Sequence, residues 1–299
     1  ITDFVHENSR AKICIQLGHV GRKGSTKAPW VGTNEPLDSD NWPLISASPI
    51  PFDTVNQTPK EMDKNDMDMI IEQFINSTKM SDEAAFDMIE IHMAHGYLLS
   101  SFISPVSNVR EDEYGGILEN RMRFPIEVLH AVRSVWPKNK PISCRISATD
   151  WLEGDGVTGY EAVKIAELLH TNGADIIDVS AGWTSSQANP VYGRMFQTHL
   201  SEQVRLEAGV PTIAVGNITS ADQVNTIVAA GRADLVALAR PHLTDPHFTL
   251  SAAAHYGFEQ QYWPDQYLAG KAQSARLAEQ ENARLDELLH ANKPQSHSQ

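Results

Sequence analysis

The chain has 299 residues, 41% of them hydrophobic, and a formal net charge of −14 at pH 7. That length suits one large α/β domain, such as a barrel of about 250 residues. The acidic balance argues against a nucleic-acid surface, and no apolar run approaches the roughly 18 residues of a membrane helix. Composition therefore favours a cytoplasmic enzyme with a small-molecule substrate and no nucleic-acid or membrane partner.

The two cysteines, Cys14 and Cys144, each lie within a predicted strand. We interpret both as small, buried hydrophobic residues. Two cysteines are too few for an all-cysteine zinc site or an iron–sulfur cluster, and so low a count suits a reducing compartment.

Strand and helix patterns alternate along the chain. Residues 1–6 resemble a helix already under way, with no initiator Met and no signal peptide, so we expect a fragment of a longer protein. The loop at 18–58 is rich in Pro, Gly, Ser and Trp, and loops of that size are usually functional. Strands are predicted at 11–17, 86–91, 141–147, 174–179, 211–215 and 234–238, and helices at 63–84, 119–135, 160–172, 201–208 and 221–229.

This alternation predicts a parallel sheet covered by helices. The six strands are two fewer than a TIM (β/α)8 barrel contains, and the other two βα units would precede Ile1. We therefore predict an N-terminally truncated barrel over residues 1–267. A doubly wound sheet is the alternative, although no GxGxxG follows any strand. Residues 268–299, rich in Ala, Glu, Lys, Arg and Leu, predict a charged helical tail with a disordered end.

Polar side chains gather where the predicted strands end, which is the ligand-facing position in parallel α/β proteins. His92, His95 and Tyr97 come directly after the strand at 86–91. The imidazoles have three interpretations: structural histidines, a metal site with His19, or hydrogen-bond donors to a substrate oxygen. We favour the third, because the one nearby carboxylate is Glu90 and none adjoins the histidines.

Arg145 lies within an otherwise apolar strand, where a guanidinium is costly to bury without an anion. Its partner is either Glu90 or Asp178 in an internal salt bridge, or a cofactor that becomes anionic. Gln16, at the end of the first strand, offers both a donor and an acceptor, which suits the edge of a heterocycle.

The last two strands end in a pattern typical of phosphate sites. Gly216 and Asn217 follow the fifth strand, and Ala239 and Arg240 follow the sixth. Backbone N–H groups beside Gly216 and the Arg240 guanidinium would cradle a phosphate, as the last two βα loops of such barrels usually do. A tight turn with a surface arginine is the alternative.

Five ordered motifs resemble those of the Old Yellow Enzyme flavoproteins, from Ile1 to about Tyr267. They are the segments Gln16–Lys23, His92–Leu98, Phe102–Phe124, Val215–Asn217 and Ala239–Pro241. Within that family, the runs 146–151 and 239–246 look most like the reductase-like C-terminal half of salicylyl-CoA and aminobenzoyl-CoA monooxygenase/reductases. In that subgroup an FAD monooxygenase domain precedes the barrel.

The resemblance implies a barrel that holds FMN and takes hydride from NADPH or NADH. The residues it assigns to the cofactor are Gln16 and Arg145 at the flavin ring, and Gly216, Asn217, Ala239 and Arg240 at the phosphate. A homo-oligomer is an open possibility, and no metal is implied.

The resemblance also assigns the catalytic residues. His92 and His95 would hold the carbonyl oxygen of an α,β-unsaturated substrate, and Tyr97 would donate a proton to the α-carbon. Lys23 would meet a phosphate or the nicotinamide cofactor. Loops such as 182–198 would select the substrate.

Two departures from the family pattern bear on these expectations. Ile117 follows the signature's Gly-Gly, where Ser is common, which we expect to be tolerated. The first two βα units are absent from the chain, so we expect weak FMN binding. A metal-dependent barrel hydrolase or lyase using His19, His92 and His95, or a non-catalytic remnant, are the alternatives.

Overall fold

The computed structural model describes residues 1–291. The chain divides into two compact units. The first comprises residues 1–217 and 226–237, and the second comprises residues 218–225 and the chain from Leu238 onward.

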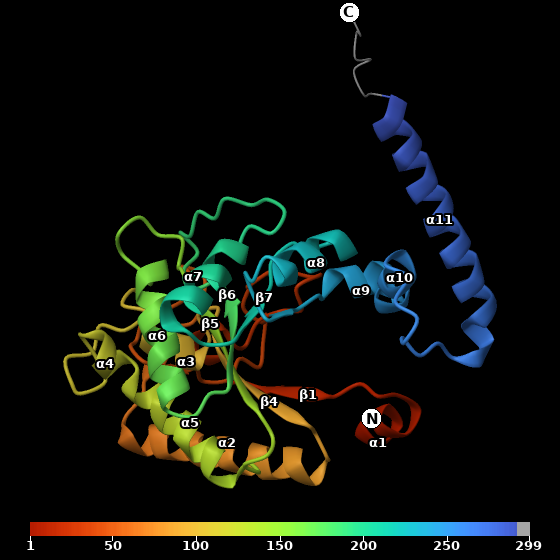
Figure 1. The fold of residues 1–299 in the computed structure, drawn as a ribbon. Coiled ribbons are helices and arrows are strands. Elements are labelled where there is room, and N and C mark those ends of the chain that lie inside the picture. The colour runs from red at the N-terminus through yellow and green to blue at the C-terminus, as the bar shows by residue number, and fades with distance from the viewer. Residues whose placement is uncertain (292–299) are drawn as a thin grey trace, which may run out of the picture. The chain divides into compact units, whose positions relative to one another are not determined.

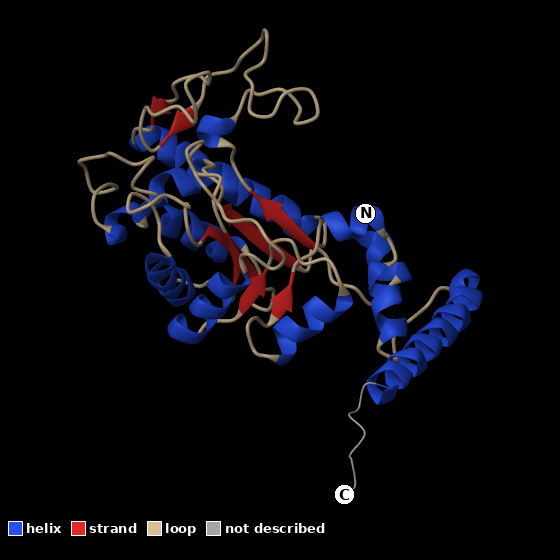
Figure 2. Ribbon diagram, turned by 90° about the horizontal axis from the view of Figure 1, so that it is seen from above, coloured by secondary structure: helices blue, strands red, loops and turns tan. Residues whose placement is uncertain are grey.

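Six parallel strands form one sheet in the first unit, in the order β1-β4-β5-β6-β7-β8 (Figures 1 and 2). Each strand pairs with the one that follows it in this sheet, as in consecutive units of a (β/α)8 barrel. A doubly wound sheet reverses its strand order, so that alternative is wrong. The strands are β1 (Cys14–Leu17), β4 (Met88–Met93), β5 (Ile142–Ser147), β6 (Ile176–Ser180), β7 (Thr212–Ala214) and β8 (Leu235–Val236).

The long loop after β1 contains structure that the sequence did not predict. A short 3₁₀ helix, η1 (Gly21–Lys23), follows β1, and β2 (Ile45–Ser46) pairs in parallel with β3 (Lys60–Glu61). The loop is therefore an ordered excursion from the sheet.

All five predicted helices are present, and the predicted helix at 1–6 is α1 (Thr2–Asn8). The helix predicted at 119–135 is interrupted at Met122, giving α4 and α5. Asp63 and Asp66 form a reciprocal capping box at the start of α2, and Thr158 caps α6. In the first unit lie α1, α2 (Lys64–Glu83), α3 (Leu98–Ile103), α4 (Leu118–Arg121), α5 (Arg123–Val135), α6 (Gly159–Thr171) and α7 (Thr198–Ala208), while α8 (Ala221–Ala229) begins in the second.

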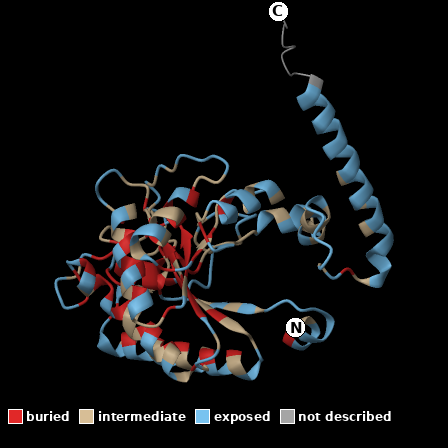
Figure 3. Cartoon of the chain, in the orientation of Figure 1, coloured by how far each residue is buried: buried red, intermediate tan, exposed pale blue. Residues whose placement is uncertain are grey.

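One face of the sheet is apolar and forms the core with α2, α5, α6 and α7 (Figure 3). Alternate strand residues point to the same face, so Ile89, Ile91, Ile146 and Val179 all reach these helices. Most of this layer is fully buried, which fixes the register of every strand, because a shift by one residue would turn the apolar side chains outward.

The opposite face of the sheet is polar. Register pairs Gln16 with Glu90, His92 with Arg145, and Arg145 with Asp178, so these side chains share a face. We call this set the polar face; its members are Gln16, Glu90, His92, Ser143, Arg145, Ser147, Asp178 and Ser180.

Two expectations about the strands need correction. Cys144 is buried on the apolar face, but Cys14 is exposed. Cys14 is two residues from Gln16 and so shares the polar face, on a strand at the edge of the sheet. His92 lies within β4 instead of after it, because the strand runs to Met93.

The second unit contains α9 (Arg240–Thr244), α10 (Phe248–His255), η2 (Asp265–Tyr267) and α11 (Leu268–Ala291). The helix predicted from residue 268 is confirmed as α11, whose residues are mostly exposed (Figure 3). The division at 267/268 stays a prediction, and the predicted disordered end, 293–299, lies outside the described residues. Among the helices of residues 1–291, none is both long and apolar enough to cross a membrane.

Candidate active site

The polar face is a hydrogen-bonded network of charged side chains. Gln16 Nε2 donates to Glu90 Oε1 at 2.7 Å, and Ser143 Oγ donates to Glu90 Oε2 at 2.9 Å. Arg145 Nε lies 3.6 Å from Asp178 Oδ2. The salt bridge that the sequence offered as one interpretation of Arg145 is therefore present, with Asp178 as the partner.

The carboxyl group of Asp178 has a raised pKa. Burial raises its pKa to about 7, with the nearby Glu90 carboxylate adding to the rise and Arg145 opposing it. Arg145 Nε and Asp178 Oδ1 are also buried without a hydrogen-bond partner in the described structure. The Arg145 guanidinium can therefore still donate a hydrogen bond to an anion or another acceptor on the polar face.

The predicted histidine pair is brought together at the end of β4. His95 Nδ1 lies 3.3 Å from His92 Nε2, and His95 Nε2 lies 2.8 Å from Ser180 Oγ. The rings therefore bond each other and Ser180, so a substrate oxygen would have to replace the bond between them. His92 is only 6% exposed, and its Nδ1 has no partner within residues 1–291.

Both imidazoles are held neutral. Burial lowers the pKa of His92 to about 4, helped by the positive charges of Arg145 and Lys23. Burial also lowers the pKa of His95, together with the proximity of His92. At neutral pH the pair consequently offers N–H donors without carrying a charge.

Tyr97 and Lys23 lie beside the histidines. The Tyr97 ring centroid is 5.1 Å from that of His92, and Lys23 Nζ lies 5.4 Å from the Tyr97 ring. Lys23 Nζ donates to His95 O at 3.1 Å and to Trp183 O at 2.9 Å. Burial and the adjacent Arg22 lower the Lys23 pKa to about 7, so this ammonium loses its proton more readily than an exposed lysine does.

The turn that carries His95 is strained and tightly packed. His95 has a φ of 63° and Gly96 a φ of 71°. A Cβ on Gly96 would meet Trp183 O at 2.8 Å, so only glycine lets this turn approach the loop after β6. The His95 N–H donates to Ser147 Oγ at 2.9 Å, and Ser147 Oγ donates to Gly182 O at 3.0 Å. The loops after β4, β5 and β6 are thereby locked together.

Sequence reasoning missed Ser147 and Ser180 as members of the site, and it named Asp178 only as a possible salt-bridge partner of Arg145. Ser147 and Ser180 are paired across β5 and β6, and each lies two residues beyond Arg145 or Asp178 on the same face. The signal was the alternation of polar residues in each strand, which becomes informative only when the register between strands is known.

The predicted phosphate residues fall into the two units. Gly216 has a φ of 112° and Asn217 a φ of 50°, and a Cβ on Gly216 would lie 2.8 Å from Gln197 Oε1. The missing Cβ of Gly216 thus lets the backbone turn sharply and approach its neighbours closely at the end of β7. Ala239 and Arg240 belong to the second unit, so the joint cradle stays a prediction.

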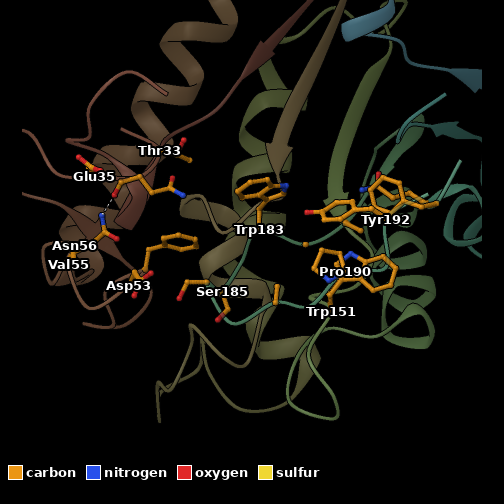
Figure 4. Close-up of a pocket in the computed structure, with 18 residues that line it drawn as sticks. Thr33, Glu35, Asp53, Val55, Asn56, Trp151, Trp183, Ser185, Pro190 and Tyr192 are labelled. Atoms are coloured by element: carbon orange, nitrogen blue, oxygen red, sulfur yellow. Dashed lines mark hydrogen bonds between the residues drawn. The ribbon is translucent and has the colours of Figure 1, made fainter. Parts of the chain in front are cut away.

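An open cleft of about 280 Å³ lies in the first unit (Figure 4). One wall comes from the loop after β1 and includes Glu35 and Asp53, and the other comes from the loops after β5 and β6. Phe52 and Trp183 line the cleft, and their rings lie 4.2 and 5.5 Å from Lys23 Nζ. The cleft therefore adjoins the histidine site. The loop 182–198, expected to select the substrate, supplies much of its second wall.

The signature run 102–124 builds structure. Asn108 Nδ2 donates to Phe102 O at 2.8 Å and to Tyr114 O at 2.7 Å. Arg110 pairs with Asp112, and Arg121 bonds both Ile103 O and Glu161. These bonds fold the segment after α3 and hold it against α6.

Comparison with known proteins identifies the family. Residues 1–259 match the model of the NADH:flavin oxidoreductase / NADH oxidase family. This chain belongs to that family. It is 46% identical to an NADPH dehydrogenase of Clostridium acetobutylicum over 244 residues, covering 81% of this chain and 67% of the relative. It is 41% identical to an NADPH dehydrogenase of Geobacillus thermodenitrificans over 247 residues, covering 83% of this chain and 67% of that relative.

Two solved structures in the comparison have the same architecture. The complex of 2-naphthoyl-CoA reductase with 2-naphthoyl-CoA is similar with a TM-score of 0.66 and 27% identity, covering 78% of this chain and 36% of that one. Morphinone reductase is similar in fold with a TM-score of 0.65 and 24% identity, covering 82% of this chain and 66% of that one. The chain thus spans about two thirds of the length of the dehydrogenases and about a third of the CoA reductase.

Family membership makes this an Old Yellow Enzyme type of flavin oxidoreductase, for which FMN and NAD(P)H are the implied cofactors. The residues fit a flavin: Arg145 and Gln16 share the polar face with His92, and Arg145 Nε is buried without a hydrogen-bond partner among residues 1–291. In the described part of the chain, no group of three His, Cys, Asp or Glu residues is arranged to hold a metal ion.

Proposed function

We propose that the protein reduces the carbon–carbon double bond of an α,β-unsaturated carbonyl compound, using hydride that FMN, when bound, has taken from NAD(P)H. The observation that carries this proposal is the pair of neutral imidazoles, His92 and His95, beside the phenol of Tyr97. Neutral donors can polarise a carbonyl oxygen, which makes the β-carbon electrophilic.

Each residue has a separate task in this reaction. His92 and His95 exchange the hydrogen bond between their rings for bonds to the carbonyl oxygen. Tyr97 donates its phenolic proton to the α-carbon as hydride reaches the β-carbon. Arg145, paired with Asp178 at 3.6 Å, stabilises negative charge beside the polar face.

Gln16 and Arg145 would hold the isoalloxazine ring, and Gly216, Asn217, Ala239 and Arg240 would hold the phosphate end. The absence of a Cβ at Gly216, which allows a ligand to approach the backbone closely, supports that second assignment. Lys23 is assigned to positioning, because its Nζ bonds two backbone carbonyls, and its predicted contact with a phosphate or nicotinamide requires those bonds to open.

An acyl-CoA substrate is the finer prediction from the subgroup resemblance. The similarity to 2-naphthoyl-CoA reductase, at 27% identity, supports it. The carboxylates of the neighbouring cleft oppose it, since CoA is strongly anionic. A cytoplasmic location and a preceding FAD domain are further proposals.

The test is an anaerobic titration of the protein incubated with FMN. Retained FMN gives a yellow protein whose absorbance is bleached by NADPH and restored by 2-cyclohexen-1-one. A colourless protein that nonetheless hydrolyses or cleaves a substrate with added zinc would favour the metal alternative. Failure to retain flavin even when the chain is extended upstream would favour a non-catalytic remnant.

A further inference from the structure

The cleft beside the histidine site has an aromatic wall. Trp151 stacks on Phe196 with centroids 6.4 Å apart and an interplanar angle of 26°, and Tyr192 meets Phe196 edge-on at 5.3 Å. Trp183 is 52% exposed and Tyr192 69% exposed. Rings left this open beside a cleft form a surface that a ligand can cover.

Trp183 is held in place by unusual backbone geometry. Its φ is 64°, and Gly182 before it has a φ of 74°. A Cβ on Gly182 would come within 2.9 Å of Trp151 Cδ1. Figure 4 shows Trp183 and Ser185 between the side chains of the loop after β1 and those of Trp151, Pro190 and Tyr192.

The wall opposite the aromatic rings is acidic. Glu35 and Asp53 line the cleft, and none of its 18 lining residues is Lys or Arg. Two lysines of that loop lie near the cleft. Lys23 is buried, with its Nζ 4.2 Å from the Phe52 ring, and it donates to two backbone carbonyls. Lys27 Nζ is 2.8 Å from Asp38 and 3.4 Å from Glu35. Apart from the buried Lys23, the carboxylates Glu35, Asp38 and Asp53 therefore outnumber Lys27 on this wall.

We propose that this cleft binds a cationic ligand, a protonated or quaternary amine on a compact apolar or aromatic body. The rings attract a cation through their negative faces, and Glu35 and Asp53 add Coulomb attraction from the other side. The net charge of −14 raises the local concentration of cations and lowers that of anions. Identifying this ligand as the reductase substrate, an enone that carries an amine, rests on the proposed function.

Binding of the cation is measured without a hydride donor. The cation can therefore bind to a protein that reduces no enone, and an enone can be reduced by a protein that does not bind the cation. The probes are benzyltrimethylammonium, benzyl alcohol and phenylacetate, which share an aromatic ring and differ in head-group charge. Their affinities are read from tryptophan fluorescence and confirmed by calorimetry. We expect benzyltrimethylammonium to bind roughly tenfold tighter than benzyl alcohol, and phenylacetate to bind most weakly.

Variants separate the two contributions. Asp53→Asn and Glu35→Gln should each lower the affinity for benzyltrimethylammonium roughly three- to tenfold and leave the affinity for benzyl alcohol unchanged. Trp183→Leu should weaken both. Glu167→Gln, an exposed carboxylate on α6, is the charge-matched control and should change neither.

Three results would overturn the proposal. They are equal or tighter binding of phenylacetate or benzoyl-CoA, an unchanged cation affinity in Asp53→Asn and Glu35→Gln, or no binding of the cation at all. A protein that binds the cation but reduces no enone would retain the site and lose the proposed function.

Discussion

His92 and His95 are hydrogen-bonded to each other, and this sets the cost of engaging a substrate. The bond between His95 Nδ1 and His92 Nε2 is 3.3 Å long, toward the weak end of the range. A carbonyl oxygen that accepts from both rings therefore replaces a poor hydrogen bond with two better ones. The lowered pKa of each ring keeps the pair uncharged while this happens.

Replacing His92 by Ala tests the carbonyl clamp. We expect a loss of roughly 2–4 kcal/mol of transition-state stabilisation, which is roughly a 30- to 1000-fold fall in kcat/KM for 2-cyclohexen-1-one. His92→Asn, which keeps an N–H donor, should fall less. His290→Ala in α11 is the control, and equal activity in all four proteins would contradict the assignment.

Replacing Asp178 by Asn tests the buried carboxyl group. Its folded pKa is raised to about 7, so between about pH 4 and 7 the folded protein holds a proton that the unfolded chain has released. The free energy of unfolding therefore falls as pH rises through this window, by on the order of 2–4 kcal/mol. His92 and His95 act in the opposite direction, because their pKa values are lowered.

The difference between wild type and Asp178→Asn isolates this contribution. Urea unfolding at pH 5, 6, 7 and 8 should show the variant gaining stability relative to wild type as pH rises. Asp175 is an exposed carboxylate one residue before β6. The stability of Asp175→Asn should change with pH in parallel with that of wild type. Parallel curves for both variants would show that Asp178 is ionised in the folded protein.

At this scale the sequence proposed candidate reactive residues, and it named a partner that the structure contains only for Arg145. Gln16 lies near the end of β1, His95 follows β4 and Arg145 lies within β5, as predicted, whereas His92 lies inside β4. Ser180 could not be assigned, because its bond to His95 joins residues 85 positions apart and depends on the pairing of strands. The prediction that Cys14 is buried was wrong for the same reason. An apolar strand pattern does not show which face of the sheet is covered by another layer.

At the scale of elements, the turn after β4 depends on Gly96. Gly96→Ala would add both the strain of a φ of 71° and a 2.8 Å contact with Trp183 O. Gly116 has a φ of 81° but no atom within 4 Å of an added Cβ, so Gly116→Ala carries the strain alone. We expect Gly96→Ala to cost more than the roughly 1 kcal/mol of a strained alanine.

Thermal unfolding of the two glycine variants measures that difference. Gly96→Ala should also reduce enone reduction, because the turn positions His95 and the Trp183 loop, whereas Gly116→Ala should leave activity intact. Equal stability losses in the two variants would show that the loops after β4 and β6 do not approach as closely as described.

The elements themselves were largely predictable from periodicity. All six strands and the main helices lie within a few residues of their predicted positions, because most of them bury apolar residues on one side of the sheet. The break at Met122 could not be predicted, because the apolar spacing continues from α4 into α5. The short pair β2 and β3 also escaped prediction, because two-residue strands have too few residues to show alternation.

For the whole molecule, charge has two opposing consequences. The net charge of −14 repels NAD(P)H, which is anionic, while the acidic cleft attracts cations. Family membership establishes the class of chemistry. The net charge of the whole protein adds a dependence of the reaction rate on ionic strength, which the individual residues of the site do not reveal.

Raising the ionic strength should therefore accelerate the reductive half-reaction. Between about 0.01 and 0.15 M salt the Debye length falls from roughly 30 to 8 Å, which screens the repulsion between protein and NADPH. We expect the second-order rate of flavin reduction, followed by stopped-flow absorbance, to rise roughly two- to fivefold. Reoxidation by 2-cyclohexen-1-one, a neutral molecule, is the internal control and should not change. A rate that falls with salt would mean that Lys23, Arg22 and Arg240 guide NADPH more strongly than the whole-molecule charge repels it.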